Sequence, residues 1–244
     1  MPLKDLFYRA GAAMARMIAV SFFLPRCRLC DLHLVQPKEK IICSDCREKI
    51  RLAAEKQCQI CGKFIPDAME TCGSCLLQTP PFLRHVAYAA YEGTLREVII
   101  LYKYGEVEAL KKLLVSLYLE ILQKKLPGPF HAVVPVPADR RRRHGFRPVW
   151  TMARLLAREL KVEFWPGLLQ KNKSTLPQVG LSQARRKTNL NGAFVMAGKQ
   201  NLAGKRILLI DDVITTGTTV RKCAALLSQS GARVSALTLA QSRF

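Results

Sequence analysis

The sequence predicts an α/β protein in which a mostly parallel sheet, flanked by helices, follows a small cysteine-rich module. Two observations predict this class. Short apolar runs alternate with amphipathic segments over residues 85–244, which is typical of strands joined by helices. Eight of the nine cysteines fall within residues 27–75, where long apolar segments are scarce. We expect four zones: an N-terminal amphipathic helix (1–26), the cysteine-rich module (27–75), a linker (76–84) and the α/β domain (85–244).

The first zone has the pattern of an amphipathic helix. Apolar side chains recur in it at helical spacing: Leu6, Ala10, Ala13, Met14 and Met17. A basic start and an apolar run are typical of a secretion signal, but Pro25 and Arg26 stand where such a signal needs small residues. The run is also too short to span a membrane. We expect a helix that packs on the protein or on a partner, with peripheral membrane contact as the alternative.

The cysteines of the second zone form four CxxC pairs: Cys27 and Cys30, Cys43 and Cys46, Cys58 and Cys61, and Cys72 and Cys75. Each pair can present two thiolates from one tight turn, and two such turns complete a tetrahedral zinc site. Eight ligands fit two zinc ions, and pairing of consecutive turns is favoured over interleaved pairing. Redox-active pairs and an iron–sulfur cluster are the alternatives. Repeated CxxC pairs indicate metal sites in a reducing compartment rather than a secreted disulfide scaffold.

A structural role for this double zinc ribbon is favoured, because so short a segment needs a metal to fold. A ribbon that contacts nucleic acid is the alternative. Gly62 and Gly73 follow or lie within the later turns, where a left-handed backbone is often required. The ninth cysteine, Cys223, lies on an expected helix and has the position of an ordinary buried thiol.

The α/β domain follows the linker, in which Pro80 and Pro81 interrupt any regular element. We expect strands at 86–91, 131–137, 207–210 and 233–240, and helices at 94–123 (broken near Gly105), 152–160 and 218–230. Gly231, directly after the last helix, is the residue type that usually ends one.

One stretch of this domain, ILLIDDVITTGTTV at residues 207–220, combines an acidic pair with the features of an anion site. Asp211 and Asp212 follow an apolar strand, at the end where ligands collect in parallel sheets. The chain then enters a helix through Thr215, Thr216, Gly217, Thr218 and Thr219. The amides and dipole of a helix N-terminus favour an anion, and ionised carboxylates accept hydrogen bonds from vicinal hydroxyls. The stretch therefore suits a ribose 5-phosphate, with plain helix capping as the alternative.

This stretch closely resembles the phosphoribosyl-pyrophosphate signature of type I phosphoribosyltransferases, which joins an apolar run, an acidic pair and TTGTT. Three further segments, with the double CxxC zone, resemble the ComF family of competence proteins: LYKYGEVEAL (101–110), VVPVPADRRRRHGF (133–146) and LPQVGLSQARRKTNLNGAF (176–194). The resemblance covers nearly the whole chain. It implies a type I phosphoribosyltransferase-like fold behind a double zinc ribbon, with phosphoribosyl pyrophosphate and Mg²⁺ as ligands.

The resemblance also implies roles for individual residues. Asp211 and Asp212 would bind the ribose hydroxyls, and residues 215–219 the 5-phosphate. The chain departs from the family at 144–148, which read His-Gly-Phe-Arg-Pro in place of Arg-Gly-Phe-Asn-Gln. The resemblance implies a pyrophosphate loop after the strand at 132–136 and a flexible loop at 178–189. The family's basic positions fall on Arg140 and Arg142 in the first loop, on Arg186 in the second, and on Lys103 before Gly105.

The charge of the chain favours polyanionic partners. It has 39 basic and 18 acidic residues, a net charge of +21. The excess is concentrated in residues 124–187, where fifteen Lys and Arg accompany three acidic residues. The run Arg140–Arg143, with Phe146 and Trp150 nearby, fits single-stranded nucleic acid as well as the pyrophosphate of the ligand. A solvated basic face is the alternative.

Three functions are compatible with these patterns. The first is a cytoplasmic ComF-type protein that binds phosphoribosyl pyrophosphate and single-stranded DNA during DNA uptake, alongside other DNA-uptake proteins. The second is an active phosphoribosyltransferase, although no catalytic base or acceptor pocket is recognisable in the sequence. The third is a regulator that senses the ligand without turnover, since the fold alone does not imply transfer.

Overall fold

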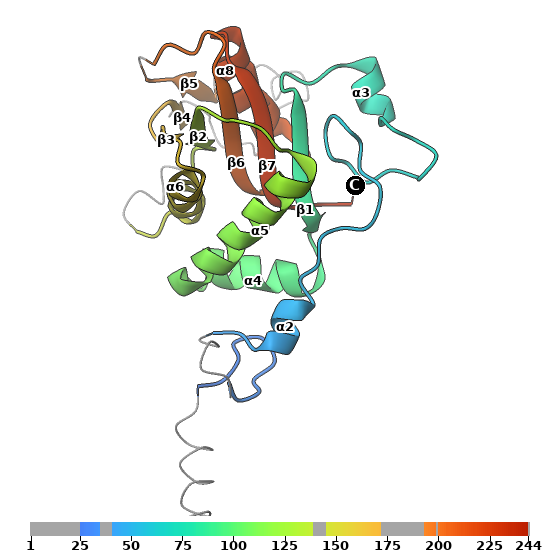
Figure 1. Cartoon of the computed structure of the whole chain (residues 1–244), viewed down its shortest axis with the longest axis vertical. Coiled ribbons are helices and arrows are strands. Elements are labelled where there is room, and N and C mark those ends of the chain that lie inside the picture. Colours follow the sequence, from blue (N-terminus) through green and yellow to red (C-terminus); the bar gives the residue numbers. More distant parts are fainter. Residues whose placement is uncertain (1–24, 35–40, 139–144, 172–192, 199, 244) are drawn as a thin grey trace, which may run out of the picture. The chain divides into compact units, whose positions relative to one another are not determined.

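A computed structural model describes residues 25–34, 41–138, 145–171, 193–198 and 200–243 (Figure 1). The chain forms two compact units, Met1–Ile50 and Arg51–Phe244. The helix expected at 1–26 lies almost entirely outside the described residues.

The first unit is built around the first four cysteines. An antiparallel bridge joins Arg26 and His33 across the first CxxC turn. Helix α2 (Ser44–Glu48) begins directly after Cys43, so that the second CxxC turn leads into a helix. This arrangement brings the two CxxC pairs of the unit together.

The second unit contains a five-stranded parallel sheet in the order β1–β7–β6–β2–β3 (Figure 1). Its strands are β1 (Arg84–Ala90), β2 (Ala132–Pro135), β3 (Glu163–Phe164), β6 (Arg206–Ile214) and β7 (Arg233–Gln241). All four expected strands are present, which confirms the α/β class. The sequence did not predict β3, nor the separate antiparallel pair β4 (Leu169–Lys171) and β5 (Phe194–Met196), because strands of two or three residues carry no periodicity.

The helices of this unit are α3 (Gly73–Leu77), α4 (Gly93–Lys103), α5 (Lys111–Lys125), α6 (Pro148–Leu160) and α8 (Thr218–Gln229), with a 3₁₀ turn η1 (Glu108–Leu110) before α5. The break expected near Gly105 separates α4 from α5. The connection β2–α6–β3 runs outward from the centre of the sheet in one direction, and β6–α8–β7 runs in the other. Because such crossovers are right-handed, α6 and α8 cover opposite faces of the sheet.

Helix α8 packs its apolar side on the sheet. Val220, Cys223 and Leu227 are buried in one cluster with Ile207 and Leu209 of β6. Cys223 is 0% exposed, which confirms the expected buried thiol. Helix α5 contacts strands β1 and β7 of the sheet, and it also contacts helix α6.

Strand β6 is longer than expected, and this corrects the position of the acidic pair. The apolar pattern predicts an end at Ile210, whereas the strand continues to Ile214 with Asp211 and Asp212 inside it. β7 pairs along this extension, but β2 ends at Pro135, opposite Ile210. The aspartates therefore lie where one neighbouring strand has stopped, which leaves room for polar side chains.

The second cysteine ribbon, which carries the CxxC turns of residues 58–75, belongs to the same unit as the sheet. This ribbon and the segment just before it cover the edge of β1. The His85 amide of β1 donates to the Ile60 carbonyl at 2.7 Å. The Ala53 amide donates to the Tyr88 carbonyl at 2.9 Å. These bonds occupy part of an edge that could otherwise pair with another chain.

Gly62 lets this ribbon approach β1 closely. Its φ is +69°, as expected for a left-handed position, and a Cβ there would lie 3.0 Å from the His85 carbonyl oxygen. Gly73 does not have a left-handed backbone and begins α3 instead. Burial lowers the pKa of His85 to about 4. The neutral ring donates from Nδ1 to the Cys61 carbonyl (2.8 Å) and accepts at Nε2 from the Thr238 hydroxyl (2.9 Å).

Candidate functional site

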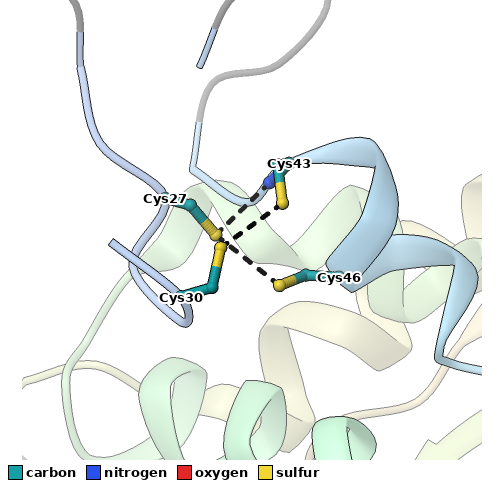
Figure 2. A group of neighbouring side chains, drawn as sticks. All are labelled: Cys27, Cys30, Cys43 and Cys46. Atoms are coloured by element: carbon teal, nitrogen blue, oxygen red, sulfur yellow. Dashed lines mark hydrogen bonds between the residues drawn. The ribbon is translucent and has the colours of Figure 1, made fainter. Parts of the chain in front are cut away.

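The first four cysteines converge on one point (Figure 2). The Sγ atoms of Cys27 and Cys46 are 3.8 Å apart, and those of Cys30 and Cys43 are 3.6 Å apart. All four sulfur atoms lie within 4.8 Å of one another. Zn–S bonds of ~2.3 Å in a tetrahedron separate the sulfurs by about 3.8 Å, so the donors fit one zinc ion.

The remaining ribbon cysteines form an equivalent group: Cys58, Cys61, Cys72 and Cys75. In each group the amide of the third cysteine points at the first sulfur, at 3.4 Å from Cys43 to Cys27 and 3.3 Å from Cys72 to Cys58. Such amides stabilise the thiolate form that metal binding requires. The groups are repeats of one knuckle, and the expected pairing of consecutive CxxC turns is confirmed.

The connections of the sheet diverge between β2 and β6. These neighbouring strands lead into α6 and α8, and then outward to opposite edges of the sheet. In open parallel sheets, ligands bind in the crevice outside the carboxyl ends of the strands at such a point. The following helices start on this side of the sheet, so their N-terminal ends favour negative charge there.

A cleft of about 760 Å³ opens at this crevice. Its lining includes Pro135–Ala138 at the end of β2 and directly after it, Pro148–Trp150 at the start of α6, Asp211 and Asp212 of β6, and the basic residues Lys103, Arg147 and Lys171. Its volume lies within the range of small-molecule sites. Cations and a carboxyl pair in one cleft suit a ligand that has both hydroxyl and phosphate groups.

Asp212 forms an ion pair with Lys103 of α4. The Lys103 Nζ lies 2.6 Å from Oδ2 and 2.9 Å from Oδ1 of this carboxylate. The Asp212 side chain is 5% exposed, and its Oδ1 also accepts from the Val213 amide at 2.8 Å. Burial opposes the charge of Lys103, but the carboxylate outweighs it and raises the pKa of Lys103. Lys103 therefore lies in the same cleft as Asp211 and Asp212, two other residues that the family resemblance assigns to the ligand.

The carboxyl group of Asp211 has a raised pKa. Burial, together with the charge of Asp212, raises the pKa of this group from 3.8 to about 8. The Tyr118 hydroxyl donates to the Asp211 carbonyl at 2.6 Å and fixes the strand here. At pH 7 the Asp211 carboxyl group is thus mainly protonated, whereas the ribose-binding role expected from the sequence takes it as ionised. One member of the acidic pair can donate a hydrogen bond while the other accepts.

The threonine loop borders a second, smaller hollow. Gly217 immediately before α8 has a φ of +75°, a conformation that favours glycine. The Thr216 hydroxyl lies 3.0 Å from the Thr218 hydroxyl and accepts from the Thr218 amide at 3.4 Å. Within the described residues, the amides of Thr215, Thr216 and Gly217 donate to no main-chain carbonyl. No main-chain carbonyl of the described residues therefore competes with a ligand for these amides.

The hollow has a volume of about 240 Å³. It is lined by Cys61, Lys63, Ser74, Phe82, Ile214, Thr215, Thr216, Gly217, Arg221 and Gln241. The acidic pair and the threonine loop thus border two separate spaces. Thr218 and Thr219 are the first two residues of α8. Three predicted ligand residues, Arg140, Arg142 and Arg186, lie outside the described part of the chain.

Sequence reasoning missed the basic and amide residues of the smaller hollow. Lys63 comes from the ribbon, Arg221 from α8 and Gln241 from the end of β7. No local pattern links segments so far apart in the chain, and only the packing of the ribbon beside β1 and β7 brings them together. For Lys63 one signal was visible, its position directly after Cys-x-x-Cys-Gly.

Comparison with known proteins matches both parts of the chain. Residues 19–76 match the double zinc ribbon domain family, and residues 150–243 match the phosphoribosyl transferase domain family. Competence protein F of Haemophilus influenzae is 31% identical over 224 residues, which cover 87% of this chain and 94% of that protein. The chain belongs to the ComF family.

Further relatives of this ComF-family chain have related names. DNA utilization protein YhgH of Escherichia coli is 32% identical over 200 residues, covering 78% of this chain and 86% of that protein. Competence protein ComFC of Streptococcus pneumoniae is 28% identical over 205 residues, covering 83% and 88%. The family matches and the parallel sheet confirm the expected type I phosphoribosyltransferase-like fold with a zinc-ribbon module.

Solved structures similar to the chain include two phosphoribosyltransferases. Adenine phosphoribosyltransferase from Thermoanaerobacter pseudethanolicus is 17% identical, with a TM-score of 0.38, and the match covers 56% of this chain and 82% of that one. Orotate phosphoribosyltransferase from Aeropyrum pernix is 24% identical, with a TM-score of 0.36 and coverages of 55% and 60%. Among the helices in the described ranges, none is both long enough and apolar enough to cross a membrane.

Proposed function

We propose that this ComF-family chain binds phosphoribosyl pyrophosphate with Mg²⁺, binds single-stranded DNA, and acts in DNA uptake in the cytoplasm. The cleft and the hollow support the first part. The names of the relatives, which refer to competence and DNA utilization, support the role in DNA uptake.

The observation that carries the ligand proposal is the short distance between the acidic pair and the threonine loop. Asp212 and Thr215 are three residues apart, so their main chains are separated by at most ~10 Å. The cleft at the carboxyl pair and the hollow at the loop are therefore within reach of one sugar phosphate. A pentose on Asp211 and Asp212 would direct its 5-phosphate to the loop amides and its pyrophosphate into the cleft.

The residues of the cleft suit the pyrophosphate end. Lys103 and Arg147 line it together with the N-terminal turn of α6, and all three favour negative charge. Mg²⁺, which prefers oxygen ligands, would neutralise the diphosphate oxygens. When the ligand binds, Lys103 would lose part of its contact with Asp212 and would contact the diphosphate instead.

Calorimetric titration with phosphoribosyl pyrophosphate and Mg²⁺ tests this proposal. The wild type should bind, and the Asp211→Asn/Asp212→Asn double variant should bind at least about ten-fold more weakly, because hydrogen bonds to a charged group are lost. Asp67→Asn, an exposed change in the same unit, is the matched control and should bind normally. Failure of the wild type to bind, or equal affinity in the double variant, would refute the proposal.

Turnover is a separate measurement. Pyrophosphate release would be followed with a panel of nucleobases and amines as acceptors. The proposal predicts binding without release, and release with any acceptor would identify an active phosphoribosyltransferase instead.

The DNA part of the proposal is supported by the exposed side of α6. Arg147, Arg154 and Arg158 are exposed, and their spacing of seven and four residues places them on one side of the helix. The Arg154 guanidinium lies 5.5 Å from the centroid of the Trp150 ring. Cations with an accompanying aromatic ring are typical of surfaces that bind single strands.

Oligonucleotide binding at several salt concentrations tests this surface. Affinity for a single strand should fall steeply with salt, and Arg154→Gln/Arg158→Gln should reduce the log–log slope by about 1.4, which corresponds to two lost phosphate contacts. Lys124→Gln removes an exposed cation from α5 and is the control. An affinity that does not change with salt would contradict the DNA proposal.

A further inference from the structure

The smaller hollow has walls from two different parts of the second unit. Helix α8, its loop and the end of β7 supply one wall, with Arg221 and Gln241. The second cysteine ribbon supplies the other, with Cys61, Lys63 and Ser74. At about 240 Å³ the hollow is smaller than a typical drug-sized pocket and suits a single phosphoryl group with its hydration.

The charges around the hollow favour an anion. Lys63 and Arg221 are both half-buried, and none of the residues that line the hollow is acidic. The Arg221 guanidinium lies 5.9 Å from the centroid of the Phe82 ring, which supports it from one side. The N-terminus of α8 adds the positive end of a helix dipole.

Gln241 independently indicates a ligand at this place. Its side chain is 6% exposed, and its Oε1 is buried with no hydrogen-bond partner in the described part of the chain. Buried polar atoms are normally paired, so the unpaired carboxamide oxygen of Gln241 indicates that a polar partner is missing beside this cationic hollow. The group can turn about its last torsion and present its NH₂ end to an anion.

The metal-binding turn fixes the position of Lys63. The Cys58 amide donates to the Lys63 carbonyl at 2.8 Å, and the Gly62 amide donates to the Cys58 carbonyl at 2.9 Å. The Ser74 hydroxyl lies 3.5 Å from the Cys72 sulfur. Lys63 and Ser74 are thus held by the turns whose thiols would bind zinc.

We propose that the second cysteine ribbon is part of the phosphate site, and that Lys63, with Ser74 and Arg221, binds the terminal phosphomonoester of the ligand. The identity of that ligand, a pentose phosphate held by Asp211 and Asp212, rests on the proposed function. Zinc in the second ribbon is then needed for phosphate binding, because it holds the turn that carries Lys63. Zinc in the first ribbon is not.

Calorimetry on the full-length, zinc-loaded protein tests the role of Lys63. Lys63→Gln should weaken ribose 5-phosphate and phosphoribosyl pyrophosphate about ten-fold or more, because a charge-assisted hydrogen bond is lost. Pyrophosphate alone, which binds in the cleft, should be unaffected. Lys63→Arg should restore most of the affinity, and Lys124→Gln on α5 should have no effect. Zinc content and the thermal midpoint, measured for each variant, show whether the ribbon is intact.

The outcomes separate this inference from the proposed function. If the wild type binds both sugar phosphates and Lys63→Gln binds them equally well, the role of the ribbon is refuted and the proposed function stands. If ribose 5-phosphate binds through Lys63 but phosphoribosyl pyrophosphate does not bind, the phosphate site stands and the proposed function fails. A Lys63-dependent preference for a 5′-phosphorylated oligonucleotide over ribose 5-phosphate would assign the site to DNA ends and overturn the pentose ligand.

A second pair of variants tests the metal. Cys46→Ser and Cys75→Ser remove the fourth ligand of the first and second cysteine group, respectively, and neither residue lines the hollow. Each should lower zinc content, but only Cys75→Ser should weaken the binding of ribose 5-phosphate. Equal affinities in both variants, with zinc lost from each, would contradict the dependence on the second ribbon.

Discussion

Replacing Asp211 by Asn should stabilise the protein, and increasingly so as the pH rises. Burial raises the pKa of this carboxyl group from 3.8 to about 8 in the folded chain. Because the pKa is raised in the folded state, the stabilisation that the protonated group gives the folded chain is fully present below about pH 4. It is lost as the pH rises towards 8. Each pH unit in this interval costs the wild type up to about 1.4 kcal/mol relative to a residue that cannot ionise.

The difference in the free energy of unfolding between Asp211→Asn and the wild type should therefore be about 2 kcal/mol larger at pH 8 than at pH 6, in favour of the variant. This figure is below the limit of about 2.7 kcal/mol for one proton over two pH units, because the carboxyl group is already partly ionised as the pH approaches its folded-state pKa of about 8. Urea unfolding followed by tryptophan fluorescence measures it. Trp150 and Trp165 are the two tryptophans of the chain, and both belong to the second unit.

Asp67→Asn serves as the control, because its side chain is exposed in the same unit. Its pH profile should run parallel to that of the wild type. Parallel profiles for Asp211→Asn and the wild type would refute the reasoning, because they would show that Asp211 has the same pKa in the folded and unfolded chain.

Three further predictions concern the metal, the ligand and the ribbon. Elemental analysis should find about two zinc ions per chain, and one or none would contradict the two equivalent groups of cysteines. Affinity for phosphoribosyl pyrophosphate should rise between pH 7 and pH 9 as Asp211 ionises and can accept both of its hydrogen bonds from the ribose, whereas Asp211→Asn should give a flat titration profile. Gly62→Ala should lower the free energy of unfolding by about 2 kcal/mol or more, because its φ is +69° and its Cβ would press on the His85 carbonyl. Gly73→Ala, with nothing within 4 Å of its Cβ, is the matched control and should change it little in a urea titration.

Much of the fold follows from local patterns. The four long strands and the break between α4 and α5 were predicted because apolar runs and a glycine mark them in the sequence. The cysteine pairing was predictable because neighbouring CxxC turns are the shortest way to assemble four thiols. Strands β3, β4 and β5 were not predictable, because each is only two or three residues long and is defined by the strand beside it.

The candidate site was predictable where it is continuous in sequence. The aspartate pair and the loop before α8 were found because they share one short stretch. The extension of β6 was not, since it depends on β7 continuing to pair where β2 has ended. The proton on Asp211 depends on burial, and the contribution of Lys63 depends on the packing of the ribbon beside β7. Neither is encoded in a local pattern.

Competition between ligand fragments tests the central claim most directly, because the cleft and the hollow should bind two ends of one molecule. Ribose 5-phosphate and pyrophosphate, titrated with Mg²⁺ into the wild type, should each bind in the presence of the other, and phosphoribosyl pyrophosphate should displace both. If the two fragments exclude each other, or if phosphoribosyl pyrophosphate displaces neither, the cleft and the hollow are not two halves of one site.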